Sequence, residues 1–102
     1  MYKYNDNVNR VWDRMNIAEA WKWGVDPDRT GERLRHLRLR ENLTQMDLED
    51  ILEKIEPVSR VSISNWERGK SIPSVQHLLA LSKIYNVSVD ALLVTREAND
   101  AA

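Results

Sequence analysis

Hydrophobic residues recur along this chain at the spacing of helices. Apolar side chains three, four and seven positions apart share one face of an α-helix, and β-branched residues nowhere alternate with polar ones as in a strand. Segments that begin at Val8, Leu48 and Val75 show the helical spacing most clearly. The pattern predicts an all-α fold, with Ile63, Trp66, Leu78 and Leu79 in its core.

Residues that start and end helices divide the chain further. Pro57 biases Glu56 away from helix, and Asn86 can close a helix in the left-handed conformation. Five helices are therefore expected, near residues 31–41, 45–55, 60–67, 75–85 and 89–94. Side-chain oxygens can cap the last four at Thr44, Ser59, Ser74 and Ser88.

The first 29 residues read as a separate segment. Gly24 and the turn-forming sequence Asp26-Pro27-Asp28 close it, and three of the four tryptophans precede that break. One helix from about Asp6 to Lys22 is expected, with a break at Asn16 as an alternative, where Asn16 would cap a second short helix. The predicted organisation is a tryptophan-rich helical extension at 1–29, a domain at 30–94 and a frayed tail at 95–102.

The role of these tryptophans stays open at this point. Trp12, Trp21 and Trp23 could extend the core over Leu39, which falls off the main apolar face of its helix. They could equally form a surface for a second subunit or another protein.

Charge is balanced in total but uneven along the chain. Fifteen basic and sixteen acidic residues give a net charge of −1, which by itself gives no sign of a nucleic-acid partner. Four arginines and no acid lie between Arg33 and Arg40, and Ser59–Lys70 holds three basic residues against one acid. A local basic face suits an anionic partner, and ordinary solvated helices fit almost as well.

Several classes of site are not expected. The chain has no cysteine, and His36 and His77 stand without companions at the spacing of metal ligands or catalytic groups. The acidic residues between Asp47 and Glu53 are interpreted as a solvated helix face. We expect no enzyme, no cofactor and no metal, and a soluble, cytoplasmic protein, because no apolar run approaches a membrane span.

Residues 59–67 place two kinds of surface on one short helix. At 100° per residue, Ser62, Ile63 and Trp66 share one side. The other side carries a guanidinium, a small apolar group, a hydroxyl and an amide, the groups that read base edges in a DNA major groove. They belong to Arg60, Val61, Ser64 and Asn65. A capped helix just before this one would complete a helix-turn-helix unit.

The sequence resembles the phage-repressor-like, or Xre-type, helix-turn-helix proteins of bacteria and their phages. The resemblance rests on GERLRHLR, LTQMDL, SRVSISNWERGKSIPS and LLALSKIYNVSVDALL, and spans Gly31 to Leu93. It implies a compact five-helix domain that binds operator DNA, usually as a dimer on a palindromic site.

The resemblance also implies roles for individual residues. The base-reading residues would be Arg60, Val61, Ser64 and Asn65, and the phosphate-contacting residues Gln45, Ser59, Arg68 and Lys70. Arg38 and Glu67 match a buried ion pair that orients the reading helix more than it stabilises the fold. Arg33, Arg35 and Arg40 are left between phosphate contact and simple solubility.

The chain departs from the family between Leu43 and Trp66, where it has a few residues more than the usual spacing. Because the apolar stripe continues to Ile55, we expect one extra turn on the second helix, which adds about 5 to 6 Å. The role assigned to Gln45 depends most on this change.

Two classes of function follow. The first is a sequence-specific, DNA-binding transcriptional regulator, a repressor that acts as a dimer on a palindromic operator and associates with the nucleoid. The second is a partner-binding protein, either an antitoxin whose residues 1–29 mask a toxin or an adaptor of the same fold that does not bind DNA.

Overall fold

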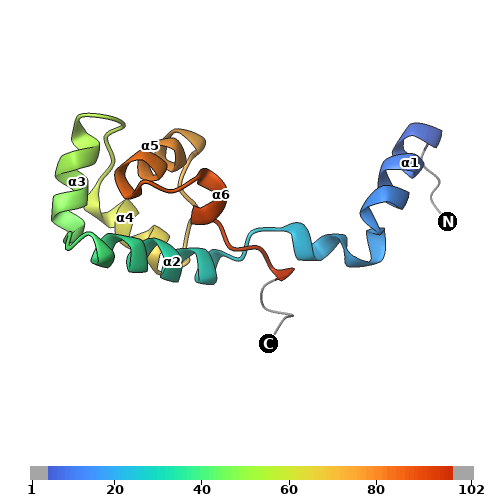
Figure 1. Cartoon of the computed structure of the whole chain (residues 1–102), viewed down its shortest axis with the longest axis horizontal. Helices are drawn as coiled ribbons and strands as arrows, with labels where there is room; N and C mark the ends of the chain where they lie inside the picture. The colour runs from blue at the N-terminus through green and yellow to red at the C-terminus, as the bar shows by residue number, and fades with distance from the viewer. Residues whose placement is uncertain (1–4, 98–102) are drawn as a thin grey trace. The chain divides into compact units, whose positions relative to one another are not determined.

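Helices dominate the part of the chain that the computed structural model describes, residues 5–97 (Figure 1). No strand occurs among these residues, so the predicted all-α class is confirmed. The chain divides into two units: Val25–Val94 forms one, and Met1–Gly24 with Thr95–Ala102 forms the other. None of the helices in residues 5–97 is long and apolar enough to cross a membrane.

The larger unit contains five helices, as predicted. They are α2 (Pro27–Arg40), α3 (Gln45–Glu53), α4 (Arg60–Glu67), α5 (Val75–Tyr85) and α6 (Val89–Leu92). Within this unit, α2 runs along the base in Figure 1, α3 stands at its far end, and α5 and α6 lie above it. Helix α4 packs chiefly against α2 and α3.

A side-chain oxygen caps the start of each of these helices. The caps accept the backbone N–H three residues further on and belong to Asp26, Thr44, Ser59, Ser74 and Ser88. At α3, the Asp47 carboxylate also accepts the backbone N–H of Thr44 at 2.9 Å, which completes a capping box. This backbone hydrogen bond, aided by the Thr44 hydroxyl, lowers the pKa of Asp47.

The predicted start of the first domain helix near residue 31 is wrong, because α2 begins at Pro27. The Asp-Pro-Asp sequence that indicated a turn is instead the first turn of the helix. Proline is well suited to this position, since its missing N–H would have no partner there and its φ is already helical. Asp26 caps the helix and Asp28 lies in its first turn.

The core is built from one face of each helix in this unit. Its most deeply buried side chains are Leu48, Leu52, Ile63, Leu81, Tyr85 and Leu92. Burial raises the pKa of the Tyr85 hydroxyl well above its usual range, and the nearby charge of Glu67 raises it further.

One predicted core residue lies outside the core. Ile63, Trp66 and Leu78 are buried as expected, whereas Leu79 is 53% exposed. Helix α5 buries the face that joins Leu78, Leu81 and Tyr85, three and four positions apart. Leu79 lies on the outer side of α5 with Val75. The buried face of α5 is therefore rotated about the helix axis relative to the predicted face.

The other unit contains α1 (Asp6–Met15) and a 3₁₀ helix, η1 (Ile17–Trp23). The chain breaks between them at Asn16, whose φ of 56° is left-handed. The predicted break is confirmed, but the Asn16 side chain makes no cap. The backbone carbonyl oxygen of Asn16 accepts the N–H of Glu19 instead. Of the predicted tail, residues 98–102 lie outside the described residues, and the N–H of Arg96 donates to Gly24 O at 2.9 Å.

Candidate nucleic-acid interface

Helix α4 presents one face to the core and another to solvent, as predicted. Ile63 is fully buried, whereas Val61 is 69% exposed. Arg60 is also exposed, and Ser64 and Asn65 are half-buried beside it. The predicted base readers therefore share the outward side of α4, and Ser59 caps its start by accepting the N–H of Ser62 at 3.2 Å.

A buried ion pair fixes the far end of α4. Arg38 donates through Nε and Nη2 to the two carboxylate oxygens of Glu67, at 2.7 and 2.9 Å, and through Nη1 to Leu43 O at 2.7 Å. Hydrogen bonding to Glu67 raises the pKa of Arg38. Gln45 Nε2 donates to the same carboxylate at 3.2 Å, so α2, α3 and α4 meet at Glu67.

Two glycines let α4 end directly against α2. Gly69 has φ +76°, and the N–H groups of Gly69 and Lys70 donate back to Trp66 O and Asn65 O, the bonds of a Schellman motif. On α2, a Cβ at Gly31 would lie 2.6 Å from the carbonyl oxygens of both Trp66 and Glu67. The end of α4 therefore rests on α2 backbone to backbone.

The extra residues before α4 do not lengthen α3. Helix α3 ends at Glu53, so the expected extra turn is wrong, and the additional length lies in the six-residue connection 54–59. The N–H groups of Ile55 and Glu56 still bond to Leu52 O, but Pro57 stops the helix from continuing. Ile55, the expected end of the apolar stripe, is exposed.

Besides Asp47 in the capping box, a second acidic residue of α3 has a specific partner. Glu49 is half-buried, and its Oε2 accepts the backbone N–H of Arg60 at 2.6 Å. The interpretation of this acidic run as a solvated face is therefore wrong for Glu49, while Asp50 and Glu53 are exposed. Sequence reasoning missed this contact because its partner is a main-chain group that carries no sequence signal.

A hollow of about 520 Å³ lies beside the start of α4. Gln45 and Arg60, from α3 and α4, both line it, so the structure brings these two predicted site residues together. Leu39 and Met46 line it too and are 48% and 53% exposed. The sequence held one sign of this apolar lining, because Leu39 falls off the buried face of its own helix.

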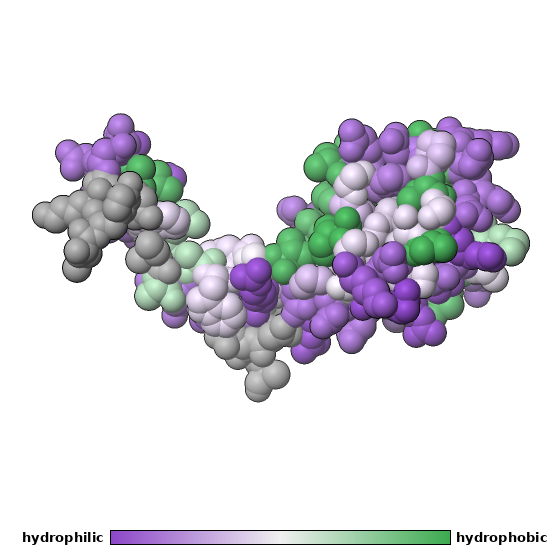
Figure 2. Space-filling model, turned by 180° about the vertical axis from the view of Figure 1, so that it is seen from behind, coloured by the Kyte–Doolittle hydropathy of each residue, from purple (hydrophilic) through white to green (hydrophobic). Residues whose placement is uncertain are grey.

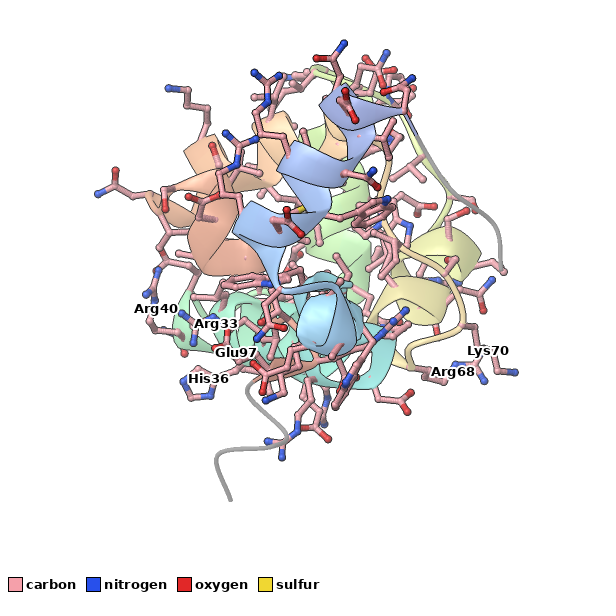
Figure 3. All side chains as sticks on the ribbon, turned by 90° about the vertical axis from the view of Figure 1, so that its right-hand side faces the viewer. Arg33, His36, Arg40, Arg68, Lys70 and Glu97 are labelled. Carbon is pink, nitrogen blue, oxygen red and sulfur yellow. The ribbon has the colours of Figure 1, made fainter. Side chains whose placement is uncertain are left out.

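Arg68 and Lys70 lie together at the end of α4. Figure 3 shows both at one edge of the domain, with Arg33, His36 and Arg40 at the opposite edge. The Arg68 guanidinium also donates to Asn65 Oδ1 at 3.0 Å. A predicted phosphate contact and a predicted base reader are thus hydrogen-bonded to each other.

Two of the α2 arginines bind carbonyl oxygens at helix ends. Arg33 donates to Ala91 O at 2.6 Å, and Arg40 donates to Tyr85 O at 2.7 Å. A guanidinium at a helix C-terminus stabilises carbonyls that have no partner within the helix. These two arginines attach α5 and α6 to α2, a role that neither prediction for them included.

Another hollow in the larger unit is lined by polar side chains of α2. Arg29, Glu32, Arg33 and His36 line an open hollow of about 370 Å³. Within residues 5–97, no three His, Asp or Glu side chains are grouped closely enough to hold a metal ion.

Comparison with known proteins identifies this arrangement. A model of the helix-turn-helix family matches residues 34–92, more than half of the chain. The chain belongs to the helix-turn-helix family. The match runs from Leu34, within α2, to the last residue of α6 and includes all of α3 and α4.

Relatives within the family include both a transcriptional activator and a repressor. The chain is 42% identical over 66 residues to the transcriptional activator BcrR of Enterococcus faecalis, covering 65% of this chain and 30% of that protein. It is 43% identical over 63 residues to repressor protein C2 of Salmonella phage P22, covering 62% of this chain and 27% of that protein. The chain thus spans less than a third of the length of these two relatives.

A solved structure of a P22 relative shares the fold. The P22 c2 repressor, in complex with a synthetic operator, superposes with a TM-score of 0.56 at 41% identity. The likeness covers 63% of this chain and 91% of that chain.

Proposed function

We propose that this chain binds double-stranded DNA sequence-specifically and thereby regulates transcription. The observation that carries the proposal is the outward face of α4, where Arg60 and Val61 are exposed while Ile63 holds the helix in the core. Likeness to a repressor solved on an operator supports it. A regulator of this kind acts on the nucleoid, in the cytoplasm.

In this proposal the outward residues of α4 read base edges. A guanidinium suits guanine, an amide suits adenine, and a small apolar side chain suits the thymine methyl group. Arg60, Asn65 and Val61 supply these groups in turn, with the Ser64 hydroxyl beside them. Phosphates would be bound by Gln45, Ser59, Arg68 and Lys70, which lie around the two ends of α4.

We further propose that the protein acts as a dimer on a palindromic operator and represses transcription by occupying it. Two copies would place two α4 helices one DNA turn apart, about 34 Å. The name of the P22 relative supports repression, while that of BcrR indicates that the same kind of domain also serves activation.

Replacing the base readers should relax sequence preference. We expect Arg60→Ala and Asn65→Ala each to weaken binding to a duplex selected from a random pool by about 1 to 3 kcal/mol, with little effect on scrambled duplexes. Binding titrations at several salt concentrations measure the affinity of each variant for the selected and the scrambled duplexes. Arg68→Ala and Lys70→Ala should instead weaken all duplexes alike, and Arg40→Gln, at the opposite edge, should change neither.

Two results would contradict the proposal. The first is that the full chain enriches no motif from random duplexes at low salt. The second is that Arg60→Ala and Arg40→Gln change the preference equally, which would exclude a special role for the outward face of α4.

A second candidate function belongs to the N-terminal segment, which we propose as an extension that binds a protein partner such as a toxin. The observation that favours it is α1, where Val8, Val11 and Met15 form an apolar face and no residue is buried. An open hollow of about 410 Å³ runs along this face. Figure 2 shows hydrophobic next to hydrophilic surface on this segment.

Substitutions on α1 test this second function in the full chain. Val8→Asp with Val11→Asp should abolish capture of a protein partner and leave DNA binding intact, because a charge on the apolar face blocks its burial. Asp13→Ser, on the other side of α1, is the matched control. Equal capture by both variants would contradict the role. Point substitutions are preferable to deleting residues 1–29, which would remove the first turn of α2.

A further inference from the structure

Glu49 holds the beginning of the outward-facing helix. The first N–H groups of an α-helix have no partner within the helix. In α4, Ser59 Oγ accepts the N–H of Ser62, and Glu49 Oε2 reaches across from α3 to accept the N–H of Arg60 at 2.6 Å. A carboxylate at this place is also favoured by the positive end of the helix dipole.

Helix α3 grips α4 at both ends through one of its faces. Gln45 and Glu49 are four residues apart and therefore lie one above the other on α3. Gln45 donates to Glu67 in the last turn of α4, and Glu49 accepts from Arg60 in the first turn. Two side chains one helical turn apart on α3 thus bind both ends of α4.

The connection between α3 and α4 is not a tight turn, so a side-chain contact can help to position the start of α4. It runs over six residues, 54–59, in place of a tight turn, and its residues Lys54, Ile55, Pro57 and Ser59 are exposed. Arg60 is the first residue after it, and its side chain is a proposed base reader while its backbone N–H is held by Glu49. The hydrogen bond therefore acts directly on the backbone of a proposed base reader.

We infer that Glu49 is a positioning residue for DNA reading: by fixing the backbone of Arg60, it sets how the first turn of α4 meets the bases. The inference rests on the proposed function. The Glu49 carboxylate would also repel DNA phosphates, so it weakens non-specific binding of DNA at the start of α4. The expected signature is a loss of discrimination rather than a uniform loss of affinity.

The experiment compares Glu49→Ala and Glu49→Gln with the wild-type chain. The ratio of affinities for the selected and a scrambled duplex should fall about tenfold in Glu49→Ala, the size of one lost base contact. Glu49→Gln keeps an acceptor oxygen at the same reach and should retain most of the ratio, although it loses the same charge. Glu53→Ala is the matched control, because it removes an exposed carboxylate one turn further along α3.

A measurement without DNA separates failure of the inference from failure of the proposed function. Hydrogen exchange at the Arg60 amide should accelerate in Glu49→Ala and stay slow in Glu53→Ala. Equal exchange in both would show that the contact is absent and overturn the inference. Equal affinity ratios in Glu49→Ala and Glu53→Ala would overturn it as well. If the wild-type chain shows no preference between duplexes, the proposed function fails and the inference with it, whatever the amide shows.

Discussion

Replacing Arg38 with methionine is expected to lower the free energy of unfolding by about 3 to 5 kcal/mol, because it leaves the Glu67 carboxylate buried without its cation. Glu67 would keep only the hydrogen bond from Gln45, and Leu43 O would lose its donor. Chemical denaturation followed by circular dichroism measures the change. A loss of this size is a large part of the total stability of a small domain.

The double variant Arg38→Met with Glu67→Met is the control for this result. Removing both charges replaces a buried ion pair with apolar side chains, which is often neutral or stabilising. The double variant should therefore recover most of the stability lost by Arg38→Met. If it were no more stable than the single variant, uncompensated charge would not be the cause of the loss.

Changing Gly31 to alanine is expected to destabilise the domain by about 3 kcal/mol, at the upper end of overpacking effects. The new Cβ would lie 2.6 Å from the carbonyl oxygens of Trp66 and Glu67, and backbone cannot turn aside as a side chain can. Without this clash the same change would stabilise a helix by up to about 1 kcal/mol. The sign of the effect therefore decides whether α2 and α4 are in contact here.

Thermal and chemical unfolding measure the effect of Gly31→Ala, with Glu32→Ala as the control at an exposed position of the same helix. We expect Glu32→Ala to stay within about 0.5 kcal/mol of the wild-type stability. A Gly31→Ala variant as stable as the wild type would show that α4 does not rest on α2 at this point.

The parts of the fold that were predictable are those that local chemistry decides. Serine and threonine at helix starts gave four caps, and Asn86 gave the left-handed end of α5. The outward face of α4 followed from periodicity alone. The Arg38 to Glu67 pair was expected only through the family resemblance, since the two residues are far apart in sequence.

The parts that were not predictable depend on tertiary contacts with the main chain. Arg33, Arg40 and Glu49 all bond to backbone groups distant in sequence, and no residue type marks such a partner in advance. Leu79 was misplaced because two apolar stripes overlap on α5, and only the packing of the other helices selects one. The end of α3 was misjudged because Ile55 continues the apolar spacing, although Pro57 follows it closely.

Because α3 binds both ends of α4, the connection 54–59 does not have to orient α4. Side chains of α3 already set the direction of α4, so the connection only has to join the two helices without strain. The entropy of closing a loop grows slowly, by about 0.6 kcal/mol for each doubling of its length. Residues can therefore be gained or lost in this connection at little thermodynamic cost, and its length can drift while the orientation of α4 stays the same.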